Sequence, residues 1–211
     1  GGGQNAVDFV ASGTLSSGQT VVLKTDGTVE AVGPTPQSAG SPVVFENADT
    51  NSIVSTYDSS SNKVIVAYRD NGNSGYGTAI VGTVSGTSIS FGSPVVFESA
   101  TSDYLSATYD STNDKTVILY SDQGNSNYGT AIVGTVSGTS ISFGSAAVFE
   151  SAGSTSTSAT FDSTNGKVVI AYRDVGNSSY GTAIVGTVSG TSISFGSATV
   201  FESANSGGPS L

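Results

Sequence analysis

The sequence predicts an all-β protein, and three observations agree on this. β-Branched and aromatic residues are interspersed with Gly, Ser, Asn and Asp, which is typical of short strands joined by turns. A Phe-Glu pair recurs every 52 residues, with its phenylalanine at Phe45, Phe97, Phe149 and Phe201. The stretch 76–93 is repeated without a change at 128–145 and 180–197. We therefore expect a tandem array of one β unit, with no helices.

Each unit divides into four strands. In the first full unit they are expected, in chain order, at 52–58, 63–70, 76–84 and 89–98. The polar turn SSSN ends the first strand, the loop NGNSG ends the second, and the tight turn SGTS ends the third. The fourth contains Gly92 and Pro94, which suggest a bulge and an edge position, because proline cannot donate to a ladder.

The second and third strands are apolar on both faces, as expected for a sheet that lies between two other sheets. Each unit is therefore predicted to be a four-stranded antiparallel meander with its fourth strand outermost. Four-stranded units at a period near 50 residues favour a β-propeller-like array, here of about 3.5–4 blades. A β-solenoid is an alternative with shorter coils. An open row of sheets, in which chains complete one another's edges as a filament, is a third arrangement.

The chain is expected to contain three full units and one incomplete unit. Residues 20–33 align with 79–92 if about seven residues, 34–40, are inserted, and 6–13 align with a degenerate second strand. The expected divisions are a partial N-terminal blade at 1–46, repeats at 47–98, 99–150 and 151–204, and a flexible tail at 205–211.

Composition excludes several kinds of site. The absence of Cys excludes disulfides and thiolate metal sites, and the absence of His excludes Ser-His-Asp chemistry and imidazole ligands. A net charge of −10 disfavours nucleic acid and anionic lipid as partners. No apolar run is long enough to insert into a membrane. Because the chain also lacks Met, we expect it to begin after processing or to be part of a longer product.

A polar loop between the second and third strands recurs as YRDNGNSGYG, YSDQGNSNYG and YRDVGNSSYG. It resembles the Asp-box of sialidase-like propellers, with one extra residue before the aromatic and no leading Ser. That resemblance implies a folding feature: Asp70 accepts bonds from its own turn, Gly72 adopts a positive φ, and Tyr76 packs across the hairpin. The alternative is a set of shallow pockets for sugars. Its residues are Arg69, Asp70, Tyr76, Ser121, Asp122, Tyr128, Arg173, Asp174 and Tyr180.

No catalytic residues, metal ligands or cofactors are predicted. A sialidase needs three arginines, and this chain has only Arg69 and Arg173. Glycoside hydrolysis needs two carboxylates in different environments. The candidate carboxylates instead recur at equivalent places, which predicts turn and edge roles for Glu46, Glu98, Glu150, Glu202, Asp58, Asp110 and Asp162. The segment DNGNS lacks the spacing of a calcium loop.

Over residues 40–204, the repeated sequence resembles tandem repeats of structural proteins encoded by marine bacteriophages. An example is the stretch 76–100, YGTAIVGTVSGTSISFGSPVVFESA. The segment 9–32 also resembles sequences that precede such repeats. This resemblance implies a non-enzymatic extracellular protein of the virion surface, such as a tail-fibre, appendage or decoration component that takes part in host attachment. Its expected partners are itself, other virion proteins and cell-surface glycans. A lectin-like propeller, or part of a glycan-degrading enzyme, is the alternative.

Overall fold

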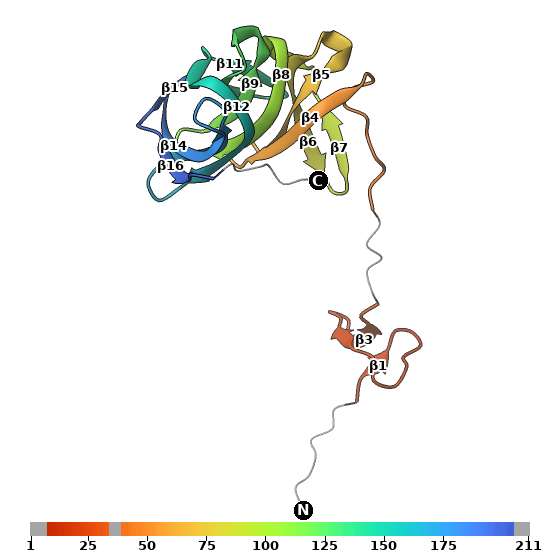
Figure 1. The fold of residues 1–211 in the computed structure, drawn as a ribbon. Coiled ribbons are helices and arrows are strands. Elements are labelled where there is room, and N and C mark those ends of the chain that lie inside the picture. Colours follow the sequence, from red (N-terminus) through yellow and green to blue (C-terminus); the bar gives the residue numbers. More distant parts are fainter. Residues whose placement is uncertain (1–7, 34–38, 205–211) are drawn as a thin grey trace, which may run out of the picture. The chain divides into compact units, whose positions relative to one another are not determined.

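The computed structural model describes residues 8–33 and 39–204, and the chain divides into two compact units, Gly1–Ala39 and Gly40–Leu211 (Figure 1). The division falls seven residues before the end expected for the partial blade at residue 46, so Phe45 and Glu46 belong to the second unit. The expected tail 205–211, and residues 34–38 of the inserted stretch, lie outside the described residues.

The first unit is a small three-stranded sheet of order β1-β3-β2. Its strands are β1 (Val10–Ala11), β2 (Val21–Leu23) and β3 (Thr28–Ala31). β2 and β3 form the hairpin expected within 20–33. β1 lies in the stretch aligned with a second strand, but it pairs parallel with β3, whereas the second strand of a repeat pairs antiparallel with the third. Among the described residues of this unit, the buried apolar side chain is that of Val29 in β3.

The second unit is built of antiparallel strands, which confirms the all-β class. The strands are β4 (Thr50–Asp58), β5 (Lys63–Asp70), β6 (Tyr76–Ser85), β7 (Ser88–Phe91), β8 (Val95–Asp110), β9 (Lys115–Asp122), β10 (Tyr128–Ser137), β11 (Ser140–Phe143), β12 (Ala147–Asp162), β13 (Lys167–Asp174), β14 (Tyr180–Ser189), β15 (Ser192–Phe195) and β16 (Thr199–Glu202). The only helical turns among the described residues are two 3-10 segments, η1 (Asn71–Asn73) and η2 (Gln123–Asn125).

The expected single strand 89–98 is two strands. β7 pairs with the second half of β6, and the beginning of β8 pairs with the first half, so both lie at the outer edge as predicted. The break falls at Gly92–Pro94, where proline has no N–H to donate. β8 then continues to Asp110 and becomes the first strand of the next sheet. β12 does the same one repeat later.

The long strands link three sheets that follow the three repeats. The first sheet contains β4, β5, β6, β7 and the beginning of β8. The second contains the end of β8, β9, β10, β11 and the beginning of β12. The third contains the end of β12, β13, β14, β15 and β16.

A bulge bends the first strand of every sheet. Ser52, Tyr104 and Ser156 have positive φ values of 50°, 49° and 51°. At these points two residues lie opposite one residue of the neighbouring strand, and the pairing register shifts. In the long strands, each bulge lies close to the point where the strand passes from one sheet to the next.

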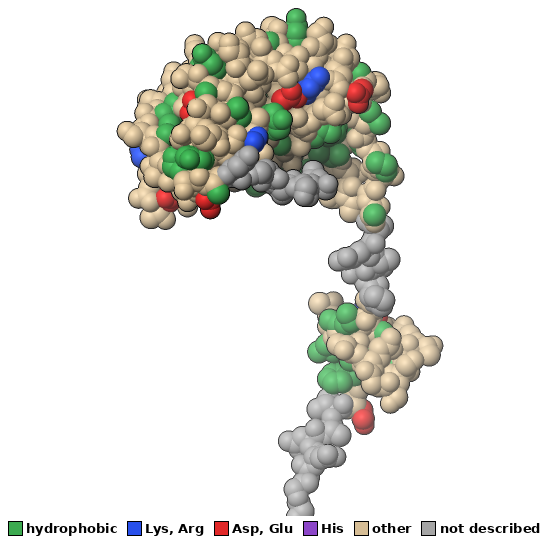
Figure 2. All heavy atoms as spheres, in the orientation of Figure 1, with side chains coloured by type: hydrophobic (Ala, Val, Ile, Leu, Met, Phe, Trp, Pro, Cys, Tyr) green, Lys and Arg blue, Asp and Glu red, His purple; other side chains and the backbone are tan. Residues whose placement is uncertain are grey.

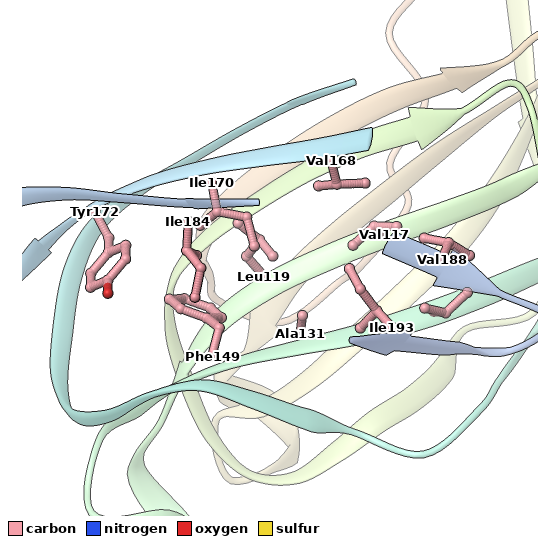
Figure 3. Close-up of a cluster of buried hydrophobic side chains, with 11 residues drawn as sticks. Val117, Leu119, Ala131, Phe149, Val168, Ile170, Tyr172, Ile184, Val188 and Ile193 are labelled. Carbon is pink, nitrogen blue, oxygen red and sulfur yellow. The ribbon is translucent and has the colours of Figure 1, made fainter. Parts of the chain in front are cut away.

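The core lies between the sheets. One face of the first sheet packs on the second through Ile65, Ala67, Val81, Ile118 and Tyr120, among others. The opposite face of the second sheet packs on the third in the same way (Figure 3). Strands β9 and β10 are therefore buried on both sides, as their apolar sequences predicted.

On the face drawn in Figure 2, charged side chains are sparse and apolar side chains form separate small groups. Within residues 8–33 and 39–204, no helix has the length and apolar character that crossing a membrane would require.

Candidate functional site

The three loops between the second and third strands, here called the Asp loops, are residues 70–75, 122–127 and 174–179. Asp70 caps η1: its Oδ1 accepts a hydrogen bond from the backbone N–H of Asn73 at 3.1 Å. Asp174 accepts the corresponding bond from Asn177 at 3.0 Å. These contacts confirm the turn-forming role expected for Asp70. The Asp122 carboxylate makes no such capping bond, although its backbone carbonyl accepts from Asn127 at 2.8 Å.

The prediction of a positive φ at Gly72 is wrong. The left-handed residues of the first loop are Ser74 and Gly75. Glycine is required at position 72 for space, because a Cβ there would lie 2.3 Å from the Cβ of Ala48. Ala48 precedes the first strand of the sheet, so the glycine allows the Asp loop to pack against the incoming chain.

The Arg69 side chain is bound across a sheet boundary. Its Nη1 donates to the Asp103 carboxylate at 2.8 Å, and both side chains are partly buried. Gln123 donates to the other oxygen of Asp103. At the equivalent place in the second sheet, Ser121 is buried and its hydroxyl donates to the Asn127 carbonyl at 3.1 Å. Arg173 occupies this position in the third sheet and is partly buried.

Within each loop, the structure brings the candidate Asp and Tyr together. The cross-strand pairs are Asp70–Tyr76, Asp122–Tyr128 and Asp174–Tyr180. The aspartates are buried and the tyrosines are partly buried. The three loops belong to three different sheets, so the nine candidate residues form three equivalent groups.

The sequence analysis missed a second repeated group, which we call the Phe-Glu-Tyr contact. At the first boundary between sheets, the Phe97 ring lies 5.3 Å from the Tyr120 ring, between centroids. The Tyr120 hydroxyl donates to Glu98 at 3.1 Å. The same contact is made by Phe149, Glu150 and Tyr172, and by Phe45, Glu46 and Tyr68. In each case Phe and Glu come from the outer strand or segment of one unit, and Tyr comes from the next sheet.

Burial affects the ionisation of this group. It raises the pKa of the Tyr68, Tyr120 and Tyr172 phenols well above the ordinary tyrosine range, and the neighbouring glutamates raise it further. Burial also raises the pKa of Glu98, and so does the negative charge of Asp122. Burial and the neighbouring glutamate therefore keep each of the three tyrosines protonated, as a hydrogen-bond donor.

The carboxylates that could have formed a hydrolytic pair have structural partners. Asp110 Oδ1 accepts from the backbone N–H groups of Thr112 and Asn113 at 2.9 and 3.0 Å. Asp58 and Asp162 make the same turn. Burial opposes ionisation of Asp58, but hydrogen bonds from Ser61 and Ser60 outweigh it and lower its pKa. The predicted turn role of these aspartates is confirmed.

The Phe-Glu-Tyr contact has a fixed spacing in the sequence, but that spacing does not identify the contact. Each glutamate precedes its tyrosine by 22 residues, as in Glu98 and Tyr120. Both residue types were visible as periodic, but the spacing does not say that they meet across two sheets. Within the described part of the chain, His, Cys, Asp and Glu side chains form no group of three or more that could hold a metal ion.

No protein family, curated protein or solved structure matches this chain.

Proposed function

We propose that this protein is a non-enzymatic structural component of an extracellular particle, namely a virion appendage or decoration protein that contributes to host-surface attachment. The observation that carries the proposal is that the repeated residues form contacts between sheets. The Arg69–Asp103 pair and the Phe-Glu-Tyr contacts all join one sheet to the next. The repeat therefore acts chiefly as a building unit. The resemblance of the repeat to those of phage structural proteins is the reason for proposing that this building unit belongs to a virus particle.

The sheets are proposed to be blades of a propeller-like array. In a propeller the first strands of successive blades lie side by side near the axis. Here the Ala159 N–H donates to the Ser106 hydroxyl at 2.9 Å, and the Thr157 hydroxyl donates to the Tyr104 carbonyl. These bonds join the first strand of the third sheet to the first strand of the second. Three blades and the outer segment of a fourth, residues 40–46, are then present in the second unit.

Attachment would depend on repetition. The Asp loops are presented once per sheet by a rigid support, so weak contacts to a repetitive surface add through effective concentration. Immunogold labelling of concentrated marine virus particles, with antibodies raised against this chain, tests the proposal. Label on tails, fibres or capsid surfaces is expected. Label confined to cells or to particle-free protein would contradict it.

A lectin-like module is the second candidate, and an exposed aromatic surface favours it. Tyr104 is 48% exposed and adjoins Asp103, whose carboxylate binds Arg69 and Gln123. An aromatic ring beside charged and amide groups is a combination that suits a sugar. A glycan array tests this: specific binding that is lost in Tyr104→Ala, and kept in the control Tyr57→Ala, would replace the structural proposal.

A further inference from the structure

The third sheet carries an apolar face that is buried in the two sheets before it. Val185 is 45% exposed, whereas its counterparts Val81 and Val133 are 0% exposed. Phe201 is 64% exposed, against 9% for Phe97 and 7% for Phe149. We call this surface the open face; its apolar residues, besides Val185 and Phe201, are Val169, Ala171 and Ala183.

The open face presents half of a Phe-Glu-Tyr contact. Phe201 packs over Gly181, just as Phe149 packs over Gly129. Among the described residues, no tyrosine meets Phe201 and Glu202 as Tyr172 meets Phe149 and Glu150.

The space beside Gly196, a glycine next to this face, is also empty. A Cβ on Gly92 or Gly144 would lie 1.9 Å from a backbone oxygen of the next sheet, that of Thr139 or Thr191. A Cβ on Gly196, the third equivalent, would meet nothing closer than the Val185 oxygen at 3.8 Å. The position is shaped to receive the turn of a further sheet.

The first sheet has the complementary face. Its outer face, defined by Tyr57, Val66, Tyr68, Ile80 and Val84, corresponds to the face through which the third sheet packs on the second. Tyr57 and Val84 are 53% and 52% exposed, while the buried Val188 is the counterpart of Val84.

The rest of this outer face is covered by a segment of the same chain, residues 40–46. Phe45 and Glu46 fill the contact with Tyr68, and Gly40 fits against the Thr87 oxygen. This segment, SPVVFE after Gly40, has the same design as SATVFE at 197–202. It belongs to no strand, because it has no neighbouring third strand to pair with, and Val44 is 71% exposed.

We propose that the open face of the third sheet binds the first sheet of a second copy of this chain, and that residues 196–202 of the first copy replace residues 40–46 of the second. Phe201 and Glu202 then receive Tyr68, and Gly196 receives the Thr87 turn. The interface repeats the two boundaries between sheets already present within the chain, and this continuity identifies the occupant. The association is heterologous and head-to-tail, so copies add in a row or close into a ring. It holds whether or not the protein belongs to a virus particle.

The test is sedimentation velocity of the full chain over a wide range of concentrations. Wild type is expected to form oligomers of increasing mass. Gly196→Ala and Phe201→Ala should weaken association at least tenfold, because one fills the turn site and the other removes the ring. Phe45→Ala should strengthen it several-fold, because it weakens only the competing segment. Val148→Ala is the control, since Val148 is 43% exposed on an edge strand away from both faces.

A mixing experiment fixes the polarity. Val185→Glu blocks the open face and Val84→Glu blocks the outer face, so each variant alone should remain a monomer. Their equimolar mixture should form a dimer, because one free face of each kind remains. Circular dichroism establishes that each variant is folded. The proposal is overturned if wild type stays monomeric at every concentration, if Val84→Glu dimerises alone, or if Phe45→Ala weakens association as Phe201→Ala does.

Discussion

At the scale of single residues, the tyrosine at each boundary between sheets contributes more to the stacking of the sheets than the residues of the Asp loop do. Tyr68, Tyr120 and Tyr172 are almost completely buried, and each places its one polar atom against a glutamate of the preceding unit. A buried hydroxyl needs a partner, so the pair fixes the register in which one sheet stacks on the next.

The first prediction concerns alkaline pH. The phenol pKa values of these tyrosines are raised above the ordinary 10.0, so the folded chain keeps protons that the unfolded chain loses. Stability should therefore fall as pH rises above 10. Urea unfolding at several pH values, followed by far-ultraviolet circular dichroism, measures the slope. Tyr120→Phe should reduce it and cost about 1 kcal/mol at neutral pH. An unchanged slope in Tyr120→Phe, or the same reduction in the exposed control Tyr104→Phe, would contradict this.

The second prediction concerns Glu98 and acidic pH. Because its pKa is raised in the folded state from the ordinary 4.5, the folded chain binds this proton more tightly than the unfolded chain. The Glu98 contribution is thus most favourable below pH 4.5 and declines as pH rises through the folded pKa. Glu98→Gln does not ionise, so its stability relative to wild type should rise between pH 4 and 7. Glu202→Gln, at an exposed position, serves as the control and should show a smaller change.

At the scale of elements, the break between the two parts of the fourth strand fits against the next sheet. Gly144→Ala should destabilise the protein by roughly 1–3 kcal/mol, because the new Cβ would overlap the next turn. Gly196→Ala is the matched control at the equivalent position and should change stability by less than about 0.5 kcal/mol. Chemical unfolding of both variants at low concentration gives the comparison. Equal losses would show that the backbone at the break, and not the neighbouring sheet, requires glycine.

The Arg69–Asp103 pair is an element-scale contact that one boundary has and the other lacks. Ser121 and Thr155 occupy its places at the second boundary. Because the pair is partly exposed, Arg69→Ser or Asp103→Thr alone should cost at most about 1 kcal/mol, and less at high salt. The double variant copies the second boundary and should cost less than the sum of the two. A strictly additive loss would show that the two side chains do not interact.

Local pattern predicted the strands well and their connections less well. β5 has the predicted bounds of 63–70, because its apolar run ends in clear turn residues. The fusion of the fourth strand with the first strand of the next unit was not predicted, because the polar stretch SATSD at 99–103 resembles a loop. The bulge at Tyr104 is likewise invisible, because its positive φ falls on a tyrosine and not on a glycine.

The candidate site was predictable only within one loop. Asp70 and its turn follow from local sequence, because the carboxylate and the N–H group that it caps are three residues apart. The partner of Arg69 lies 34 residues away in another sheet, and no local rule reaches it. Propensity reports what a segment forms, whereas contacts between sheets depend on how completed sheets stack.

At the scale of the whole molecule, the three sheets should differ in stability although their sequences are nearly the same. Within the described residues 40–204, only the second is covered on both faces by another sheet. Native-state hydrogen exchange should therefore find the slowest amides in β9 and β10 and faster exchange in β4 and β16. The measurement belongs at low concentration, with Gly196→Ala beside wild type. Uniform protection in all three sheets would mean that they open as one unit.

The division of each Phe-Glu-Tyr contact between two repeats also bears on how the gene can change. Any one repeat brings the Phe-Glu half for its successor and the Tyr half for its predecessor. Residues 76–93, 128–145 and 180–197 are identical, so an unequal genetic exchange within them removes or adds one whole sheet. Every product has a complete Phe-Glu-Tyr contact at each internal boundary, whatever its length. Such a lineage can lengthen or shorten the array in single steps without altering the two surfaces at its ends.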